Sequence, residues 1–172
     1  ALTRCVKVSD EDRPYIAILG GLKVSDKIKV IESLLKKCDK ILIGGAMSYT
    51  FAKALGKEIG TSPCELDQLD YARKCYESGK ILLPVDSVCA DAFEGYTQIK
   101  TVCAKEGIPA GFEGLDIGPK TREMFKEVVQ GAKVIFWNGP MGVFENPLFA
   151  EGTESICKVL TQLTAEKGAF TV

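Results

Sequence analysis

Short runs of hydrophobic residues alternate along this chain with longer segments in which apolar residues recur every three or four positions. The short runs predict β-strands, and the three-four spacing predicts amphipathic α-helices. The expected strands are Tyr15–Leu19, Lys40–Ile43, Lys80–Leu83, Val88–Ala90, Val134–Trp137 and Ala169–Val172. The expected helices are Ser25–Lys37, Met47–Leu55, Leu66–Glu77, Thr121–Gln130 and Thr153–Thr164.

This alternation predicts an α/β fold, a Rossmann-like parallel sheet with helices on both faces in three α/β/α layers. Glu94–Gly118 is richer in glycine and polar residues, so we expect a long connection there, either irregular or as extended strands crossing one edge. Residues 1–12 are polar and aperiodic, as in a linker or hinge remnant, and residues 13–172 form the expected domain. The chain starts with alanine, and no turn or helix follows the last strand, so we expect a segment of a longer protein.

The net charge and the hydropathy of the chain exclude some classes of binding partner. The 172 residues are 46% hydrophobic and 26% charged with a net charge of −1, so no broad basic face is expected for nucleic acid or an anionic membrane. No apolar run approaches the roughly 18 residues of a membrane span, and the first residues lack the order of a signal peptide. The chain is therefore expected to be cytoplasmic, with neither nucleic acid nor membrane as a partner.

The spacing of the cysteines and the absence of histidine limit the kinds of metal and catalytic site that the chain can form. The seven cysteines are scattered without a C-x-x-C pair, which argues against disulfides and zinc, and Cys89 and Cys157 are expected in the core. Histidine is absent, which excludes Ser-His-Asp and Cys-His nucleophilic sites. Chemistry must rest on lysine, carboxylates, backbone amides or a bound metal.

Two lysines follow the first strand where a helix should begin. The strand stops at Gly20-Gly21, and Lys23 and Lys27 come next. Ser25 is a suitable N-cap, which places Lys27 beside the positive end of the helix dipole, where a cation costs roughly 0.3 to 1 kcal/mol. A bound phosphate would reverse that penalty. The alternative is a pair of solvated lysines on an ordinary strand-to-helix turn.

Two further strands end in glycine, at Gly44-Gly45 and at Asn138-Gly139. Each such turn can be purely structural, but loops of a parallel sheet meet at its carboxyl edge, where nucleotides bind. With Lys23, Lys27 and Asn138 they predict a phosphate site. Neither a Walker A sequence nor G-x-G-x-x-G after the first strand is present, which disfavours those classes. Three aspartates near these loops are expected to order them: Asp86, Asp91 and Asp116.

Together, five motifs in order closely resemble the nucleotide-binding half of phosphoglycerate kinase. They are Gly20-Gly21-Leu22-Lys23-Val24-Ser25-Asp26-Lys27, Ile43-Gly44-Gly45-Ala46-Met47-Ser48-Tyr49-Thr50-Phe51, Leu83-Pro84-Val85-Asp86, Gly114-Leu115-Asp116-Ile117-Gly118-Pro119 and Trp137-Asn138-Gly139-Pro140-Met141-Gly142-Val143-Phe144-Glu145. The resemblance implies glycolytic phosphoryl transfer between 1,3-bisphosphoglycerate and MgADP, giving 3-phosphoglycerate and ATP. Residues 13–172 would then be part of the nucleotide-binding domain.

The resemblance also implies a role for each matching residue. Lys23 would neutralise the phosphoryl group in flight, Lys27 and Asn138 would contact the nucleotide phosphates, and Glu145 would hold the ribose. The residues that would frame the adenosine are Gly21, Leu22, Gly45, Ala46, Gly114, Leu115, Pro140, Gly142 and Val143. Phosphoryl transfer depends mainly on positioning and electrostatic stabilisation, which agrees with the absence of histidine.

Some positions depart from the family pattern. Leu22 stands where alanine is usual and Ala46 where glycine is usual, which crowds the base pocket, and Phe112-Glu113 replaces tryptophan and an apolar residue. The aspartate that anchors magnesium would follow the last strand, and the 3-phosphoglycerate site would lie in the N-terminal half, so both are expected outside this chain. The chain alone is expected to be inactive, in a family that is usually monomeric. The alternatives are a non-catalytic nucleotide-binding or interaction module, and another nucleotide transferase.

Overall fold

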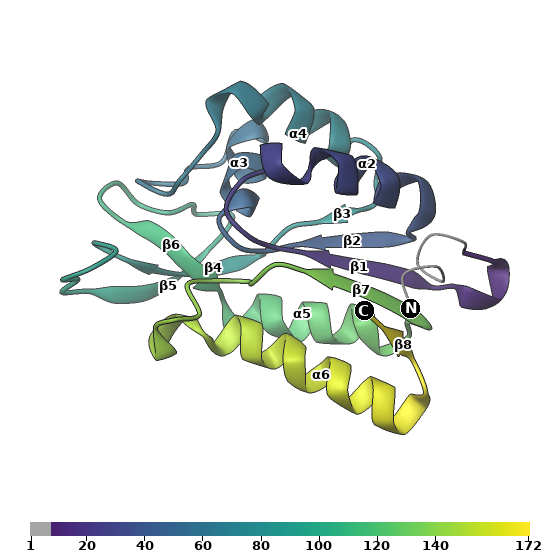
Figure 1. Cartoon of the computed structure of the whole chain (residues 1–172). Coiled ribbons are helices and arrows are strands. Elements are labelled where there is room, and N and C mark those ends of the chain that lie inside the picture. The colour runs from purple at the N-terminus through teal and green to yellow at the C-terminus, as the bar shows by residue number, and fades with distance from the viewer. Residues whose placement is uncertain (1–7) are drawn as a thin grey trace.

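A parallel sheet of five strands runs through the middle of the molecule (Figure 1). The computed structural model describes residues 8–172. The strand order is β3-β2-β1-β7-β8, and every neighbouring pair is parallel. The strands are β1 (Tyr15–Leu19), β2 (Lys40–Ile43), β3 (Ile81–Leu82), β7 (Val134–Asn138) and β8 (Phe170–Thr171). The order reverses between β1 and β7, where doubly wound sheets bind ligands.

Helices cover both faces of this sheet, as the sequence predicts (Figure 1). One layer holds α2 (Ile28–Lys37), α3 (Met47–Ala54) and α4 (Leu69–Tyr76), and the other holds α5 (Pro119–Gln130) and α6 (Glu151–Lys167). Short 3₁₀ turns lie at Asp10–Asp12, Ser25–Lys27, Leu66–Gln68 and Pro147–Phe149. The three-layer α/β/α architecture is confirmed.

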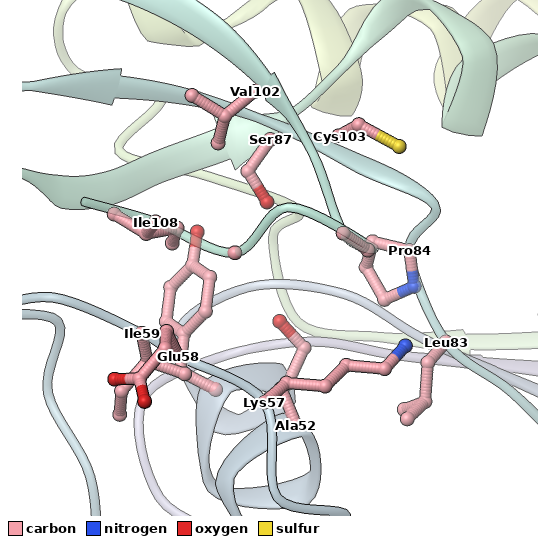
Figure 2. A pocket seen from close by; sticks show the side chains of 14 residues that line it. Ala52, Lys57, Glu58, Ile59, Leu83, Pro84, Ser87, Val102, Cys103 and Ile108 are labelled. Carbon is pink, nitrogen blue, oxygen red and sulfur yellow. The ribbon is translucent and has the colours of Figure 1, made fainter.

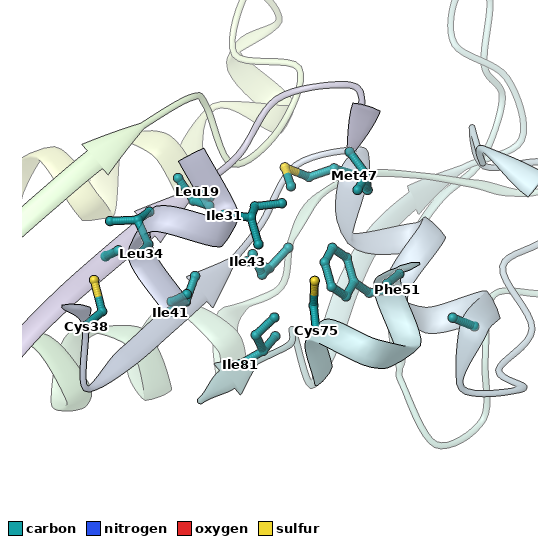
Figure 3. Packing of buried hydrophobic residues seen from close by; sticks show 14 of the residues in the cluster. Leu19, Ile31, Leu34, Cys38, Ile41, Ile43, Met47, Phe51, Cys75 and Ile81 are labelled. Carbon is teal, nitrogen blue, oxygen red and sulfur yellow. The ribbon is translucent and has the colours of Figure 1, made fainter. Parts of the chain in front are cut away.

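The strand β1 belongs to two hydrophobic cores, one on each face of the sheet. Tyr15, Ala17 and Leu19 pack towards α2, α3 and α4, whereas Ile16 and Ile18 pack towards α5 and α6. Figure 3 shows Leu19 among the residues of the first of these cores. All five residues are buried. Because both faces are covered, the strand is continuously apolar, as is typical of central parallel strands.

A second, antiparallel sheet stands at one end of the molecule. Its strands β4 (Asp86–Ala90), β5 (Ile99–Cys103) and β6 (Glu113–Ile117) have the order β5-β4-β6. Val88–Ala90 therefore does not join the parallel sheet, because no helix returns the chain between β3 and β4. The Glu94–Gly118 connection contains two of these strands, which confirms the extended alternative. They do not cross an edge of the main sheet.

Two local predictions are wrong. Ser25 does not cap a helix, because it lies inside a 3₁₀ turn and its hydroxyl donates to Glu65 Oε2 at 2.6 Å. Cys157 is exposed, because α6 buries its neighbours Ile156 and Val159 instead; Cys89 is buried as expected.

The amino-terminal residues carry one further expectation. Residues 1–7 of the expected linker lie outside the described part of the chain, while Val8 packs against the core. The boundary at residue 12 stays a prediction. Within residues 8–172, we find no helix with the length and hydropathy needed to cross a bilayer.

Candidate functional site

A cleft of about 380 Å³ opens where the loops after β1, β2 and β7 meet the antiparallel sheet. Ten residues predicted from the resemblance line it: Gly21, Leu22, Gly45, Ala46, Gly114, Leu115, Pro140, Gly142, Val143 and Glu145. They come from four separate segments of the chain. The fold therefore gathers them at the carboxyl edge of β1, β2 and β7, as the sequence predicts.

The three remaining predicted residues do not line the cleft itself. The Lys27 ammonium donates to Asn138 Oδ1, and a methyl group at Gly21 would lie 3.6 Å from Lys27 Cε. Lys27 and Asn138 thus lie beside a residue of the cleft wall. Lys23 is exposed on the turn that follows Gly21, and its ammonium forms no ion pair with any residue from 8 to 172.

The electrostatics of Lys27 favour an anionic partner. Burial lowers the pKa of its ammonium, and the opposing effect of Asp26 is smaller. A desolvated cation at the start of a helix is stabilised by a nearby negative charge. The Lys27–Asn138 corner can therefore hold a phosphate.

Backbone contacts join the three glycine loops to one another. The amide of Gly21 donates to Pro140 O at 3.1 Å, that of Gly45 donates to Met141 O at 3.0 Å, and that of Met47 donates to Gly21 O at 3.0 Å. The sequence suggested that glycine serves here to let amides approach a ligand. Several of these amides instead donate to carbonyl groups of neighbouring loops. The glycines therefore hold together the loops that form the rim of the cleft.

Gly45 shows why a side chain is not tolerated in this rim. Its φ is +68°, and a methyl group there would lie 2.6 Å from Gly21 N and 2.8 Å from Pro140 O. Both contacts are with backbone, which cannot rotate away, and the positive φ is itself strained for other residues. The close approach of the β1, β2 and β7 loops therefore depends on glycine.

Tyr49 forms the wall between the cleft and a second cavity. Its ring lies where a Gly114 side chain would be, since a methyl group at Gly114 would sit 2.1 Å from the Tyr49 hydroxyl. Burial raises the pKa of this hydroxyl, which interacts with Ser87. The second cavity, of about 40 Å³, lies between the end of α3 and the antiparallel sheet, with Val102 on one side and Ala52 on the other (Figure 2).

Large apolar side chains surround the mouth of the cleft. Leu22, Phe93 and Phe144 are 60%, 54% and 50% exposed and all line it. Sequence reasoning missed Phe93 because it stands alone in a polar segment. Tyr49, Met141 and Phe144 lie within the motifs that carry the resemblance. Their positions in those motifs were the signal that could have identified them. The exposed rim can cover a flat apolar group such as a base.

The three aspartates accept backbone hydrogen bonds, but only Asp91 orders a loop, as predicted, whereas Asp86 and Asp116 hold the starts of helices. Asp91 accepts hydrogen bonds from the hydroxyl of Thr97 and from the amides of Gln98 and Thr97, and these bonds lower its pKa. Asp86 and Asp116 are buried and accept from backbone amides at the starts of α5 and α6. None of the three lines the cleft.

This architecture is a doubly wound α/β domain with a cleft at the point where its strand order reverses, which is where such sheets commonly bind ligands. The profile of the family described as phosphoglycerate kinase matches residues 2–172. The chain belongs to the phosphoglycerate kinase family.

Individual relatives agree with this assignment. The chain is 57% identical over 157 residues to the phosphoglycerate kinase of Streptococcus equi subsp. zooepidemicus, covering 90% of this chain and 39% of that protein. It is 50% identical over 169 residues to that of Thermosipho africanus, covering 95% and 42%. The chain thus spans about two fifths of the length of the curated relatives it matches.

Solved structures are similar too. The structure of phosphoglycerate kinase from Coxiella burnetii superposes with a TM-score of 0.88 at 34% identity, covering 94% of this chain and 42% of that one. The enzyme from Pyrococcus horikoshii gives 0.78 at 30% identity, covering 92% and 41%. The similarity therefore extends over the parallel and the antiparallel sheet together.

Proposed function

We propose that this chain is the nucleotide-binding part of a phosphoglycerate kinase, which transfers a phosphoryl group between 1,3-bisphosphoglycerate and MgADP. The observation that carries the proposal is the gathering of ten predicted residues around one cleft. The cleft volume and its apolar mouth suit a purine nucleoside, and the Lys27–Asn138 corner suits its phosphates.

Each residue then has a physical role. The small residues of the rim let the adenine and ribose approach the backbone, and Glu145, exposed at the mouth, accepts hydrogen bonds from the ribose hydroxyls. Lys27 and Asn138 bind the nucleotide phosphates. Lys23, whose ammonium is free of ion pairs within the described chain, neutralises the transferring phosphoryl group.

The proposal places magnesium and 3-phosphoglycerate on residues other than those that line the cleft. Among residues 8–172 no group of three or more acidic, cysteine or histidine side chains is placed to hold a metal. The buried Asp116 already accepts two amide hydrogen bonds, and Glu145 stands alone at the mouth. In the proposed function the metal ligand and the phosphoglycerate site lie outside this chain, as the resemblance implies.

The test is the Lys23→Ala substitution in the full-length protein. Loss of a charge that acts mainly in the transition state lowers kcat by about 100-fold or more, with a much smaller change in nucleotide affinity. Lys36→Ala is the matched control, because Lys36 is exposed on α2 far from the cleft. An unchanged kcat for Lys23→Ala would remove Lys23 from this role.

A non-catalytic module of the same fold predicts a different result. Its support is the position of the two-residue strand β8 at the edge of the sheet, since an edge strand can pair with another chain. Titration calorimetry with ADP and sedimentation separate the two functions. Tight self-association without heat from ADP favours the module, and binding of ADP to a monomer favours the kinase.

A further inference from the structure

The side chain of Asp116 lies directly behind the wall of the cleft. Gly114 and Leu115, the preceding residues of β6, line the cleft, and Leu115 O accepts the amide of Val143, another lining residue, at 2.9 Å. Asp116 itself is 1% exposed. A carboxylate is seldom buried to this extent unless its hydrogen bonds are satisfied.

The Asp116 carboxylate holds the start of α6 against β6. Its Oδ2 accepts the amide of Gly152 at 3.0 Å, and its Oδ1 accepts the amide of Ile117 at 2.8 Å. The N-cap residue of α6, Ala150, supplies no capping side chain. Asp116 therefore replaces the missing cap from a distant strand.

The same carboxylate also sets the position of the loop after β7. A methyl group at Gly142 would lie 2.5 Å from Asp116 Oδ1, so this part of the cleft wall rests on the carboxylate. Gly142 lines the cleft and Gly152 does not. One buried group thus links α6 on one side to the cleft wall on the other.

The charge of Asp116 depends on these partners. Burial raises the pKa of its carboxyl to about 6, while the amides of Gly152 and Ile117 and the charge of Arg122 lower it, and Glu151 raises it. Arg122 Nη1 and Glu151 Oε2 pair with each other at 2.9 Å beside it. The hydrogen bonds from the Gly152 amide of α6 and the Ile117 amide of β6 therefore oppose the effect of burial on this pKa.

We propose that Asp116 is a positioning residue for the nucleotide, which fixes the Gly142–Val143 wall of the cleft relative to α6 without touching the ligand itself. This inference rests on the proposed function, because it takes the cleft to be the nucleotide site. Asp116→Asn replaces one acceptor oxygen by a donor and sets an N–H group against one of the two amides. The α6 start and the cleft wall then move apart.

Asp86 provides a matched control. It is 3% exposed and accepts the amides of Lys120 and Thr121 at the start of α5, so its chemical surroundings are similar. Asp86 does not line the cleft. Its carboxylate also does not lie against a glycine of the cleft wall. Asp86→Asn therefore lowers stability without changing the shape of the cleft.

The experiment compares the KM for MgADP and the thermal midpoint of both variants in the full-length protein. We expect Asp116→Asn to raise the KM by about tenfold, the typical consequence of one lost buried hydrogen bond, and Asp86→Asn to leave it within about twofold. Both variants lower the thermal midpoint. A purely structural role lowers the active fraction, and so kcat, without changing KM. Equal KM values in the two variants would overturn the inference, whereas a wild-type protein that does not bind MgADP would overturn the proposed function.

A second substitution applies if Asp116→Asn does not fold. A methyl group at Gly152 would lie 2.3 Å from Asp116 Oδ1, so Gly152→Ala displaces the carboxylate from outside the cleft. Gly131→Ala at the end of α5 is its control, because nothing lies within 4 Å of a methyl group there. The inference requires a raised KM for Gly152→Ala alone, and it fails if the two alanine variants share the wild-type KM.

Discussion

The helices α5 and α6 lie side by side on the same face of the sheet, and neither begins with a capping side chain of its own. Each is capped instead from the antiparallel sheet, α5 by Asp86 of β4 and α6 by Asp116 of β6. Each also presents a threonine hydroxyl in its first turn. Thr121 accepts the amide of Asp86, and Thr153 accepts the amide of Met141.

The difference between the two junctions lies in what each holds. At the start of α5 the two side chains bind each other, because the Thr121 hydroxyl lies 2.6 Å from the Asp86 carboxylate that caps the same helix. The α6 junction reaches the cleft, because Met141 and Gly142 belong to its lining. Burial and charge alone therefore do not distinguish a structural carboxylate from a functional one. The distinction depends on which segment the carboxylate holds in place.

The largest expected effect is on stability at the α5 junction. Asp86→Ala leaves the amides of Lys120 and Thr121 without their acceptor and removes one of the two acceptors of the Thr121 hydroxyl, which costs about 3 kcal/mol of unfolding free energy. Urea denaturation measures this loss. Asp91→Ala removes a similar number of hydrogen bonds at an exposed hairpin, so its effect is expected to be far smaller. Equal losses would contradict the role given to burial.

Substitutions of the two threonines, Thr121 and Thr153, distinguish an effect on stability from an effect on the cleft. Thr121→Val removes the acceptor of two backbone amides and Thr153→Val that of one, and each is expected to cost about 1 to 2 kcal/mol of unfolding free energy. Only Thr153→Val loosens a cleft-lining loop, so only that variant raises the KM for MgADP. Denaturant titrations and steady-state kinetics on both variants check this. The comparison breaks down if Thr121→Val raises the KM equally.

The smallest expected effect is a pH dependence specific to Asp116. Its pKa is raised from an ordinary value of 3.8 to about 6, so its contribution to stability is fully present below pH 3.8 and is lost as the pH rises through 6. Between pH 7 and pH 5 this contribution increases by about 1 kcal/mol. Wild type minus Asp116→Asn, measured by urea denaturation at several pH values, isolates it from the other carboxylates. Parallel pH curves would contradict the raised pKa.

The sequence predicted the parallel sheet well because its strands are buried on both faces. A run such as Tyr15–Leu19 has no polar residue, and glycine marks its end, so the strand was placed correctly to the residue. The antiparallel sheet was harder, because β5 is largely exposed and its apolar residues show no clear alternation. Its pairing with β4 depends on contacts distant in the sequence, which local patterns do not record.

The candidate site shows the same division. Lys27 and Asn138 were recognisable from local motifs, and the structure brings them into contact. The cap that Asp116 gives to α6 joins residues 36 positions apart, and only the folded chain reveals it. Ser25 was misassigned for a related reason, since its partner Glu65 lies 40 residues further along. Local propensity gives way to tertiary hydrogen bonds at each of these positions.

The mutual hydrogen bonds of the glycine loops bear on how the cleft moves. Because the amides of Gly21, Gly45 and Met47 are each held by a loop from another part of the rim, they should exchange with solvent slowly and at a common rate. Glycine-rich segments are often assumed to be flexible, but the hydrogen bonds between these loops preorganise the rim of the cleft. In the proposed function, little conformational entropy is then lost when the nucleotide binds, which strengthens its binding.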